Sequence, residues 1–311
     1  MALGMAIGID AMRACEASAG WRGLRLRWCG VARLPRELIR ASPWEENLAT
    51  LAGFREPLAE ALQGLWFRRR LQVGLPESSV RVCTVFADAL PRDPAALRKY
   101  LLWRVADVVD CHPERTRLAY MAFPSPLPGP RYAITCALTG EQVARQYERA
   151  LAESRIRYTG MAPNSVLLFN LFHQELAGPP GAPVLLLAAA EEALTTIITL
   201  DGCPIFWRSL ALAPPGEAGP AWGNGRRGEM ARDIAEAVTY AGEQLGVEPP
   251  ARVLVTGPPA EEPGLAAWLA ARVGLPTTCL EARHLLKRVP RHLAGEGWDH
   301  WGAALGAAAR G

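Results

Sequence analysis

The stretch VLLLAAAEEALTTIITLDG at residues 184–202 decides how the chain is interpreted. It predicts a buried apolar strand, a turn, a second strand rich in Thr and Ile, and a hairpin turn at Asp201-Gly202. Proteins that hold nucleotide phosphates in such a strand–turn–strand unit place Gly and small hydroxyl residues in the first turn. Backbone N–H groups must approach the phosphate closely there.

In this chain the first turn reads Ala188-Ala189-Ala190-Glu191-Glu192. Two carboxylates at the position of an anion repel it, and Ala disfavours the positive φ angles that Gly permits. We therefore expect the scaffold to be kept and the phosphate site to be lost.

The composition is that of a globular protein with room for two domains. The chain has 311 residues, of which 50% are hydrophobic and 21% charged. A net charge of +3 is too small to indicate nucleic acid as a partner. The basic run Arg68-Arg69-Arg70 follows the helical pattern of residues 54–67, and we interpret it as the C-terminus of a helix at about 54–71.

The seven cysteines are odd in number, scattered, and contain no CxxC pair, which favours a reducing, cytoplasmic location. The opening MALGMAIGIDAMRA has no charged leading segment and a short apolar run, so it predicts a strand and not a signal peptide. No run approaches the roughly 18 apolar residues that a membrane-spanning helix needs. Membrane association is therefore expected only through partners.

Periodicity and turn signals predict alternating strands and helices. Strands are expected at 4–9, 23–29, 31–35, 79–90, 115–123, 131–138, 251–257 and 276–280, and in the pairs within 184–200 and at 204–212. Helices are expected at 54–71, 93–109, 140–153, 163–176, 228–246, 262–273 and near 301–310, with a turn at Gly74-Leu75-Pro76.

This order, a β-meander followed by helix and strand and then repeated, is the plan of an α/β, actin-like (ribonuclease-H-like) two-domain fold. A small α/β insertion subdomain is expected in the first half, and AGPPGAP at 177–183 marks the clearest boundary. The expected division is residues 1–92 and 161–178 for the first subdomain, 93–160 for the insertion, and 181–311 for the second domain.

Three local patterns carry further predictions. Asp93 and Pro94 predict the start of a helix. The segment from Ser42 to Asn47 resembles a helix-capping box, with Ser42 as N-cap, and Trp44 there is a candidate for partner binding. Residues 223–228, GNGRRG, resemble a phosphate loop but lack a preceding strand and a following Lys-Ser/Thr, so they predict a flexible loop.

Four segments together resemble the PilM family. These are actin-like cytoplasmic proteins of the type IV pilus inner-membrane platform and relatives of the cell-division protein FtsA. The opening AIGIDAMRACEA matches the family's first strand, which ends in Gly-Ile-Asp. The segments at 73–107, 137–172 and 231–276 are similar to its strand–loop–helix, its return to the first domain, and its closing helix–strand–turn–helix. Their order and spacing extend over nearly all residues.

The chain departs from nucleotide-binding members of that superfamily in three loops. Asp10 is kept, but Ala11 to Cys15 follow it in place of Gly and hydroxyl residues. The second phosphate loop falls on Ala188-Ala189-Ala190, and the adenosine loop on Gly257-Pro258-Pro259, where Pro removes N–H donors. The resemblance thus leaves Asp10, Glu191 and Gly257 as vestigial cofactor-binding positions, with no ATP or Mg²⁺ expected.

No catalytic residues and no metal site are predicted. The five histidines show no i, i+4 pair and no Cys at metal spacing, so surface or helix-end positions are expected for them. They are His112, His173, His284, His292 and His300.

The resemblance implies a non-catalytic cytoplasmic scaffold of the type IV pilus platform, with a role in twitching motility. It would bind the cytoplasmic N-terminal tail of a PilN-like inner-membrane protein and link it to the motor ATPases and platform proteins. The expected docking surface is the groove between the first subdomain and its insertion, where an extended peptide can lie along exposed backbone.

Three alternatives stay open at this point. One is a divergent actin-like ATPase or kinase that uses Asp10 and Glu191. Another is a cytoplasmic component of a type II secretion platform. A third is an FtsA-like membrane tether, which needs a C-terminal amphipathic helix, whereas residues 301–310 predict the fold's own closing helix.

Overall fold

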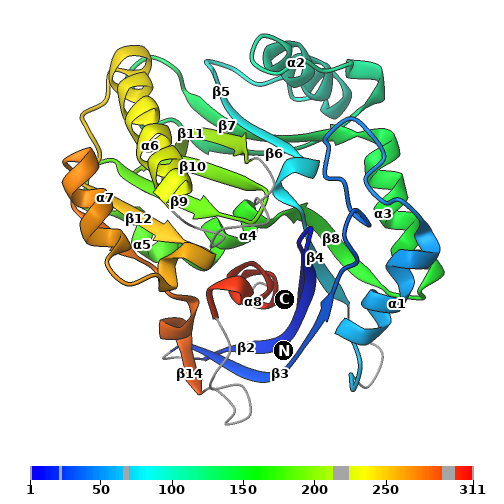
Figure 1. Cartoon of the computed structure of the whole chain (residues 1–311). Coiled ribbons are helices and arrows are strands. Elements are labelled where there is room, and N and C mark those ends of the chain that lie inside the picture. Colours follow the sequence, from blue (N-terminus) through cyan, green and yellow to red (C-terminus); the bar gives the residue numbers. More distant parts are fainter. Residues whose placement is uncertain (1, 21–22, 66–69, 213–223, 289–297, 310–311) are drawn as a thin grey trace.

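The computed structural model describes residues 2–20, 23–65, 70–212, 224–288 and 298–309. In this part of the chain the strands form three sheets with helices on their faces (Figure 1). We call the part built on the six-stranded sheet the first lobe, the part built on the five-stranded sheet the second lobe, and the part built on the three-stranded sheet the insertion.

The six-stranded sheet has the order β14 (Leu286–Arg288), β3 (Gly23–Arg33), β2 (Ala11–Gly20), β1 (Ala2–Ile7), β4 (Leu71–Leu75), β8 (Tyr158–Pro163). The five-stranded sheet has the order β11 (Cys203–Ala211), β10 (Ala193–Leu200), β9 (Val184–Ala189), β12 (Arg252–Thr256), β13 (Thr277–Cys279). The three-stranded sheet has the order β5 (Arg81–Ala87), β7 (Tyr132–Gly140), β6 (Thr116–Pro124).

The α-helices are α1 (Leu51–Ala61), α2 (Pro94–Ala106), α3 (Glu141–Glu153), α4 (Asn164–Leu171), α5 (His173–Ala177), α6 (Asn224–Leu245), α7 (Leu265–Val273) and α8 (Gly302–Ala309). Short 3-10 helices are η1 (Glu77–Ser79), η2 (Pro113–Arg115), η3 (Pro258–Glu261), η4 (Ala282–Leu285) and η6 (Trp298–Trp301).

Residues 184–202 form the hairpin that their sequence predicts. Residues 184–189 and 193–200 are buried throughout as β9 and β10, which pair in antiparallel register. The next turn, at Asp201 (φ 51°) and Gly202 (φ 76°), has positive φ at both residues and leads directly into β11. This is the geometry that Asp-Gly favours between right-twisted strands.

The first lobe contains a strand that the sequence analysis missed. Residues from Ala11, predicted as a degenerate loop, are β2, which pairs with β1 and β3. The predicted turn at 74–76 is also wrong, because Gly74 and Leu75 lie in β4 between β1 and β8. A Cβ at Gly74 would lie 2.1 Å from Oδ1 of Asn164, so a larger residue at this strand position would displace that side chain.

The helix predicted at 54–71 begins three residues earlier than predicted and ends ten residues earlier. α1 begins after Thr50, whose hydroxyl accepts the Gly53 N–H, and ends at Ala61. Gly64 (φ 84°) then turns the chain, and Leu71 starts β4 by donating its N–H to the Arg157 carbonyl. The helix therefore does not reach Arg70, while Arg68 and Arg69 lie outside the described residues.

Two further local predictions need correction. Ser42 Oγ accepts the N–H groups of Trp44 and Glu45, as a capping residue does, but no helix follows it, and α1 begins only at Leu51. Residues 224–228 are the first turns of α6 and not a loop. By contrast, Asp93 accepts the Ala96 N–H at 2.7 Å and caps α2 as predicted.

The strand pairings differ from the predicted domain boundaries at two points. β5, placed with the first subdomain, pairs with β7 in the insertion. β14, placed with the second domain, pairs with β3 in the first lobe, and α8 packs there against β1 and α4. The chain thus returns to the first lobe at its end.

α8 is the closing helix that the sequence predicts. Its residues 302–308 are all buried, and it lies at the centre of the molecule in Figure 1. Backbones meet closely here, because a Cβ at Gly4 or at Gly306 would lie 2.2 Å from the carbonyl oxygen of Ala304 or Leu167, respectively. A helix buried in this way cannot serve as the amphipathic anchor of an FtsA-like tether. Among the described residues, no helix is long and apolar enough to cross a membrane.

We predict opposite effects of Gly→Ala at two helix positions. Gly306→Ala forces a methyl group against the Leu167 carbonyl and is expected to lower the free energy of unfolding by about 1–3 kcal/mol. Gly228→Ala, an exposed position of α6 with no atom near the added methyl, is expected to raise it by about 0.5–1 kcal/mol. Urea denaturation of both variants checks this, and equal effects would contradict the close packing of α8.

Candidate functional site

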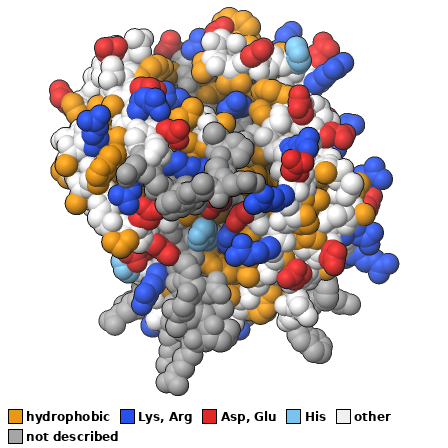
Figure 2. All heavy atoms as spheres, viewed as in Figure 1, with side chains coloured by type: hydrophobic (Ala, Val, Ile, Leu, Met, Phe, Trp, Pro, Cys, Tyr) orange, Lys and Arg blue, Asp and Glu red, His pale blue; other side chains and the backbone are white. Residues whose placement is uncertain are grey.

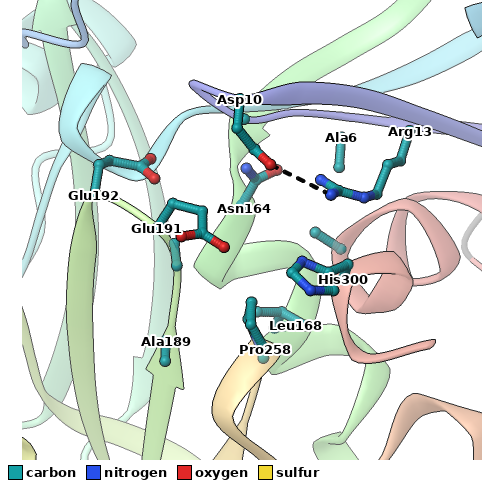
Figure 3. Close-up of a pocket in the computed structure, with 14 residues that line it drawn as sticks. Ala6, Asp10, Arg13, Asn164, Leu168, Ala189, Glu191, Glu192, Pro258 and His300 are labelled. Atoms are coloured by element: carbon teal, nitrogen blue, oxygen red, sulfur yellow. Dashed lines mark ion pairs between the residues drawn. The ribbon is translucent and has the colours of Figure 1, made fainter. Parts of the chain in front are cut away.

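Three loops from the two lobes meet at one cavity of about 70 Å³. The loop after β1 contributes Asp10, the turn after β9 contributes Glu191, and the end of β12 contributes Gly257. The structure therefore brings together all three residues that the resemblance named as vestigial cofactor positions. The carboxylates of Asp10 and Glu191 and the ring of His300 point into the same space (Figure 3).

The first loop is closed by its own backbone. Gly8 donates its N–H to the Ala11 carbonyl at 2.9 Å, and the Asp10 carbonyl accepts the Leu34 N–H. The Asp10 carboxylate lies 3.5 Å from the Arg13 guanidinium in an ion pair (Figure 3). The Gly8 N–H is thus used within the turn and is not directed at a ligand.

The second loop is a tight turn with two acidic side chains. Ala190 N–H donates to the Ala193 carbonyl at 2.8 Å, as expected for a two-residue hairpin connection. Burial, and next the Asp10 carboxylate, raise the pKa of Glu191, while Arg226 and Arg13 oppose the shift. A phosphate group placed in this cavity would therefore be repelled by the nearby carboxylates, whose own ionisation is already unfavourable there.

In the third loop, the packing of the protein itself requires the glycine, and no nucleotide is needed to account for it. Gly257 has φ 100°, and a Cβ there would lie 2.0 Å from the carbonyl oxygen of Ala189. The glycine is needed because β12 passes close to the end of β9. Pro258 and Pro259 follow without N–H donors and begin η3.

His300 is the cavity residue that sequence reasoning missed. It was expected at a surface or helix end, but η6 places it in the cavity beside Asp10 and Glu191. Burial, and next the charge of Arg13, lower the pKa of His300. It also lines a larger, open cavity of about 750 Å³ next to the first, together with Arg33, Glu60 and Trp301. No sequence signal joined residue 300 to residue 10, because the return of the chain to the first lobe through β14 and α8 depends on long-range packing.

These residues do not fit a magnesium nucleotide triphosphate. The Gly8 and Ala190 N–H groups are used within turns, Pro258 and Pro259 have no N–H, and three carboxylates line the cavity. Among the described residues, no three His, Cys, Asp or Glu side chains are grouped closely enough to hold a metal ion.

A buried carboxyl network joins the two lobes beside the cavity. Glu77, which is 2% exposed, accepts hydrogen bonds from the backbone and hydroxyl of Ser165 in the first lobe and from the hydroxyl of Ser209 in the second. The Glu77 N–H donates to Oε1 of Glu192 at 2.9 Å. Burial, and next the charges of Glu77 and Asp10, raise the pKa of Glu192 to about 7, although hydrogen bonds from backbone N–H groups oppose the shift.

The groove expected between the first lobe and the insertion is present as two adjoining cavities. One, of about 570 Å³, lies between residues 46–51, α3 and η2. The other, of about 230 Å³, is lined by Trp44 and residues 110–116. Both cavities are lined by Arg115 and Gln142, so they lie next to each other.

Gln146 holds part of the groove wall. Oε1 of Gln146 in α3 accepts the N–H groups of Asn47 and Leu48, and its Nε2 donates to the Leu48 carbonyl. These bonds tie residues 47 and 48, which lie before α1, to α3. Among the described residues, Glu46, Glu114 and Arg115 face the groove without an ion-pair partner within 4.0 Å. Over the molecular face in Figure 2, acidic and basic side chains are intermixed, with no large patch of one sign.

The whole chain is similar to a chain of a PilM–PilN type IV pilus biogenesis complex, with a TM-score of 0.81 and 17% sequence identity. The likeness covers 99% of this chain and 97% of that chain. A Bacteroides thetaiotaomicron protein with actin-like ATPase fold and unknown function is similar over 90% of each chain, with a TM-score of 0.51 and 10% identity. The chain has the actin-like ATPase fold.

The predicted fold class is thereby confirmed, and so is the resemblance to PilM at the level of the fold. No protein-family model matches the chain, and no curated protein matches it.

We predict that Glu192 makes this actin-like protein less stable as pH rises. Its carboxyl has a pKa of about 7 in the folded state against 4.5 when unfolded, so the folded state binds the proton more tightly. The cost of ionising it is absent below pH 4.5, grows up to pH 7, and reaches up to about 3 kcal/mol above that. Glu192→Gln keeps the acceptor for the Glu77 N–H and removes this cost.

Urea denaturation at a series of pH values tests this expectation. The variant should match the wild type near pH 4.5 and exceed its stability above pH 7. A constant difference at all pH values would show that Glu192 does not titrate in this window.

Proposed function

We propose that this chain is a non-catalytic scaffold of a type IV pilus or related secretion platform, placed at the cytoplasmic side of the inner membrane by its partners. The observation that carries the proposal is the full-length likeness to a chain of a PilM–PilN complex, combined with phosphate loops whose donors are used or missing. A folded actin-like body needs no nucleotide chemistry to bind proteins.

The proposed ligand is the extended cytoplasmic N-terminal tail of a PilN-like membrane protein. Two adjoining cavities, of about 570 Å³ and about 230 Å³, support this, because together they offer room for a peptide between residues 44–51, η2 and α3. Arg115 lines both parts and is exposed, so we assign it a contact with the peptide. Through this tail the scaffold would link the membrane protein to the motor ATPases and platform proteins, and thereby to twitching motility.

The second candidate, a divergent ATPase, is favoured by one observation. Asp10 and Glu191 line the same cavity and could act together on a nucleotide. Isothermal titration of the chain with Mg-ATP separates the two functions. We expect no binding heat, because carboxylates and prolines occupy the phosphate cradle. Micromolar binding with turnover, both lost in Asp10→Ala, would establish the ATPase instead.

The peptide site is tested with a charge reversal and a matched control. The ligand is a synthetic peptide of about twenty residues from the N-terminus of the neighbouring-gene membrane protein. Arg115→Glu should weaken its binding about tenfold or more, whereas Arg131→Glu, an exposed arginine outside the groove, should leave it unchanged. Binding is measured by fluorescence anisotropy. Equal affinities of both variants would remove Arg115 from the site, and no binding by the wild type would contradict the proposed partner.

A further inference from the structure

Among the described strands, β6 forms the open edge of the insertion's sheet. The sheet order β5-β7-β6 leaves β6 paired with β7 on one side, and no other described strand pairs with it. At the opposite edge, β5 lies beside β11 of the second lobe. With nine residues β6 is longer than a typical strand of about five or six, so it exposes a long row of backbone donors and acceptors.

β6 lacks the features that protect most open edges. Its pairing with β7 runs from Thr116 to Pro124 without a register shift, so no bulge twists the edge away. All residues from Ala119 to Ala122 are exposed, with Tyr120 at 47% and Met121 at 39%. From Leu118 onward the strand carries no charge, and its one proline lies at the end. Soluble proteins rarely leave such an edge uncovered.

The one charged residue of the strand does not guard the edge. Arg117 is held by Glu141 and Glu148 of α3. Its charge is therefore directed at the insertion's own helix, at the groove end of the strand. A covering strand would meet an apolar, uncharged surface over the remaining length.

We infer that β6 pairs antiparallel with β6 of a second copy of this chain, forming a two-fold dimer with a continuous six-stranded sheet. A two-fold axis perpendicular to the sheet maps each face of the sheet onto itself. Side chains that lie opposite each other then point to the same face, so their residue numbers are both even or both odd. The register that pairs all nine residues places Tyr120 opposite its own copy.

The strand is complementary to itself in this register. Met121 lies opposite the small Ala119, and Leu118 lies opposite the small Ala122. Arg117 lies opposite Phe123, so no like charges meet across the interface. The two Tyr120 rings form the central cross-strand pair, an arrangement that stabilises antiparallel strands. This symmetry favours a second copy over an unrelated strand as the occupant.

The experiment uses two charge variants of the central residue. Tyr120→Lys and Tyr120→Glu each place like charges opposite each other, so each variant alone should be monomeric under conditions where the wild type dimerises. An equimolar mixture places Lys opposite Glu and should recover the dimer. Trp103→Lys serves as the control, since Trp103 is 62% exposed on α2 and lies off the strand edge.

Sedimentation equilibrium gives the dimer dissociation constant of each full-length chain, and circular dichroism verifies that each variant folds. We expect Tyr120→Lys to raise the dissociation constant at least about tenfold, and Trp103→Lys to leave it unchanged. A wild type that is monomeric throughout the accessible concentration range overturns the inference. Unaltered dimerisation of Tyr120→Lys, or a mixture that stays monomeric, also overturns it.

Discussion

The close contact of α8 with the first lobe is the constraint on which the centre of the molecule depends. Gly4 and Gly306 let the helix backbone lie directly against β1 and α4, which no larger residue permits. The helix is built almost entirely of Gly and Ala, so its buried surface is nearly smooth. Its position brings η6, and with it His300, into the cavity between the lobes.

Next to α8, the loops and side chains of the protein itself fill the space between the two lobes. The turns after β1 and β9 are closed by their own hydrogen bonds, and the backbone of Gly257 packs directly against the carbonyl of Ala189. Glu77 then joins α4 to β11 across the cleft. Because the lobes are connected directly, the relative position of the lobes does not need a bound phosphate as a bridge. This arrangement agrees with a body whose outer surfaces carry the function.

The insertion offers two such surfaces at different places. The groove uses the start of β6, η2 and α3, where charged side chains of both signs meet. The open edge uses the apolar middle and end of the same strand. One strand thus lies between the polar groove, where we propose that a peptide binds, and the apolar edge, which we propose pairs with a second copy. The two surfaces differ in their physical basis. Charged side chains dominate the groove, whereas unpaired backbone groups dominate the open edge of β6.

The amino-acid sequence by itself determined the features that depend on neighbouring residues. The apolar runs of β9 and β10, the Asp201-Gly202 turn and the Asp93 cap follow from burial, φ preference and local hydrogen bonding, and all are present.

Tertiary structure decided what depends on distant residues. The helical pattern after Ala61 is broken because Leu71 pairs with Arg157, and β2 is a strand because β1 and β3 flank it. Gly257 and His300 take their places through contacts with β9 and through α8, which local pattern does not encode. Local periodicity reports which face of a segment is apolar, whereas the partner that covers this face is set by long-range packing.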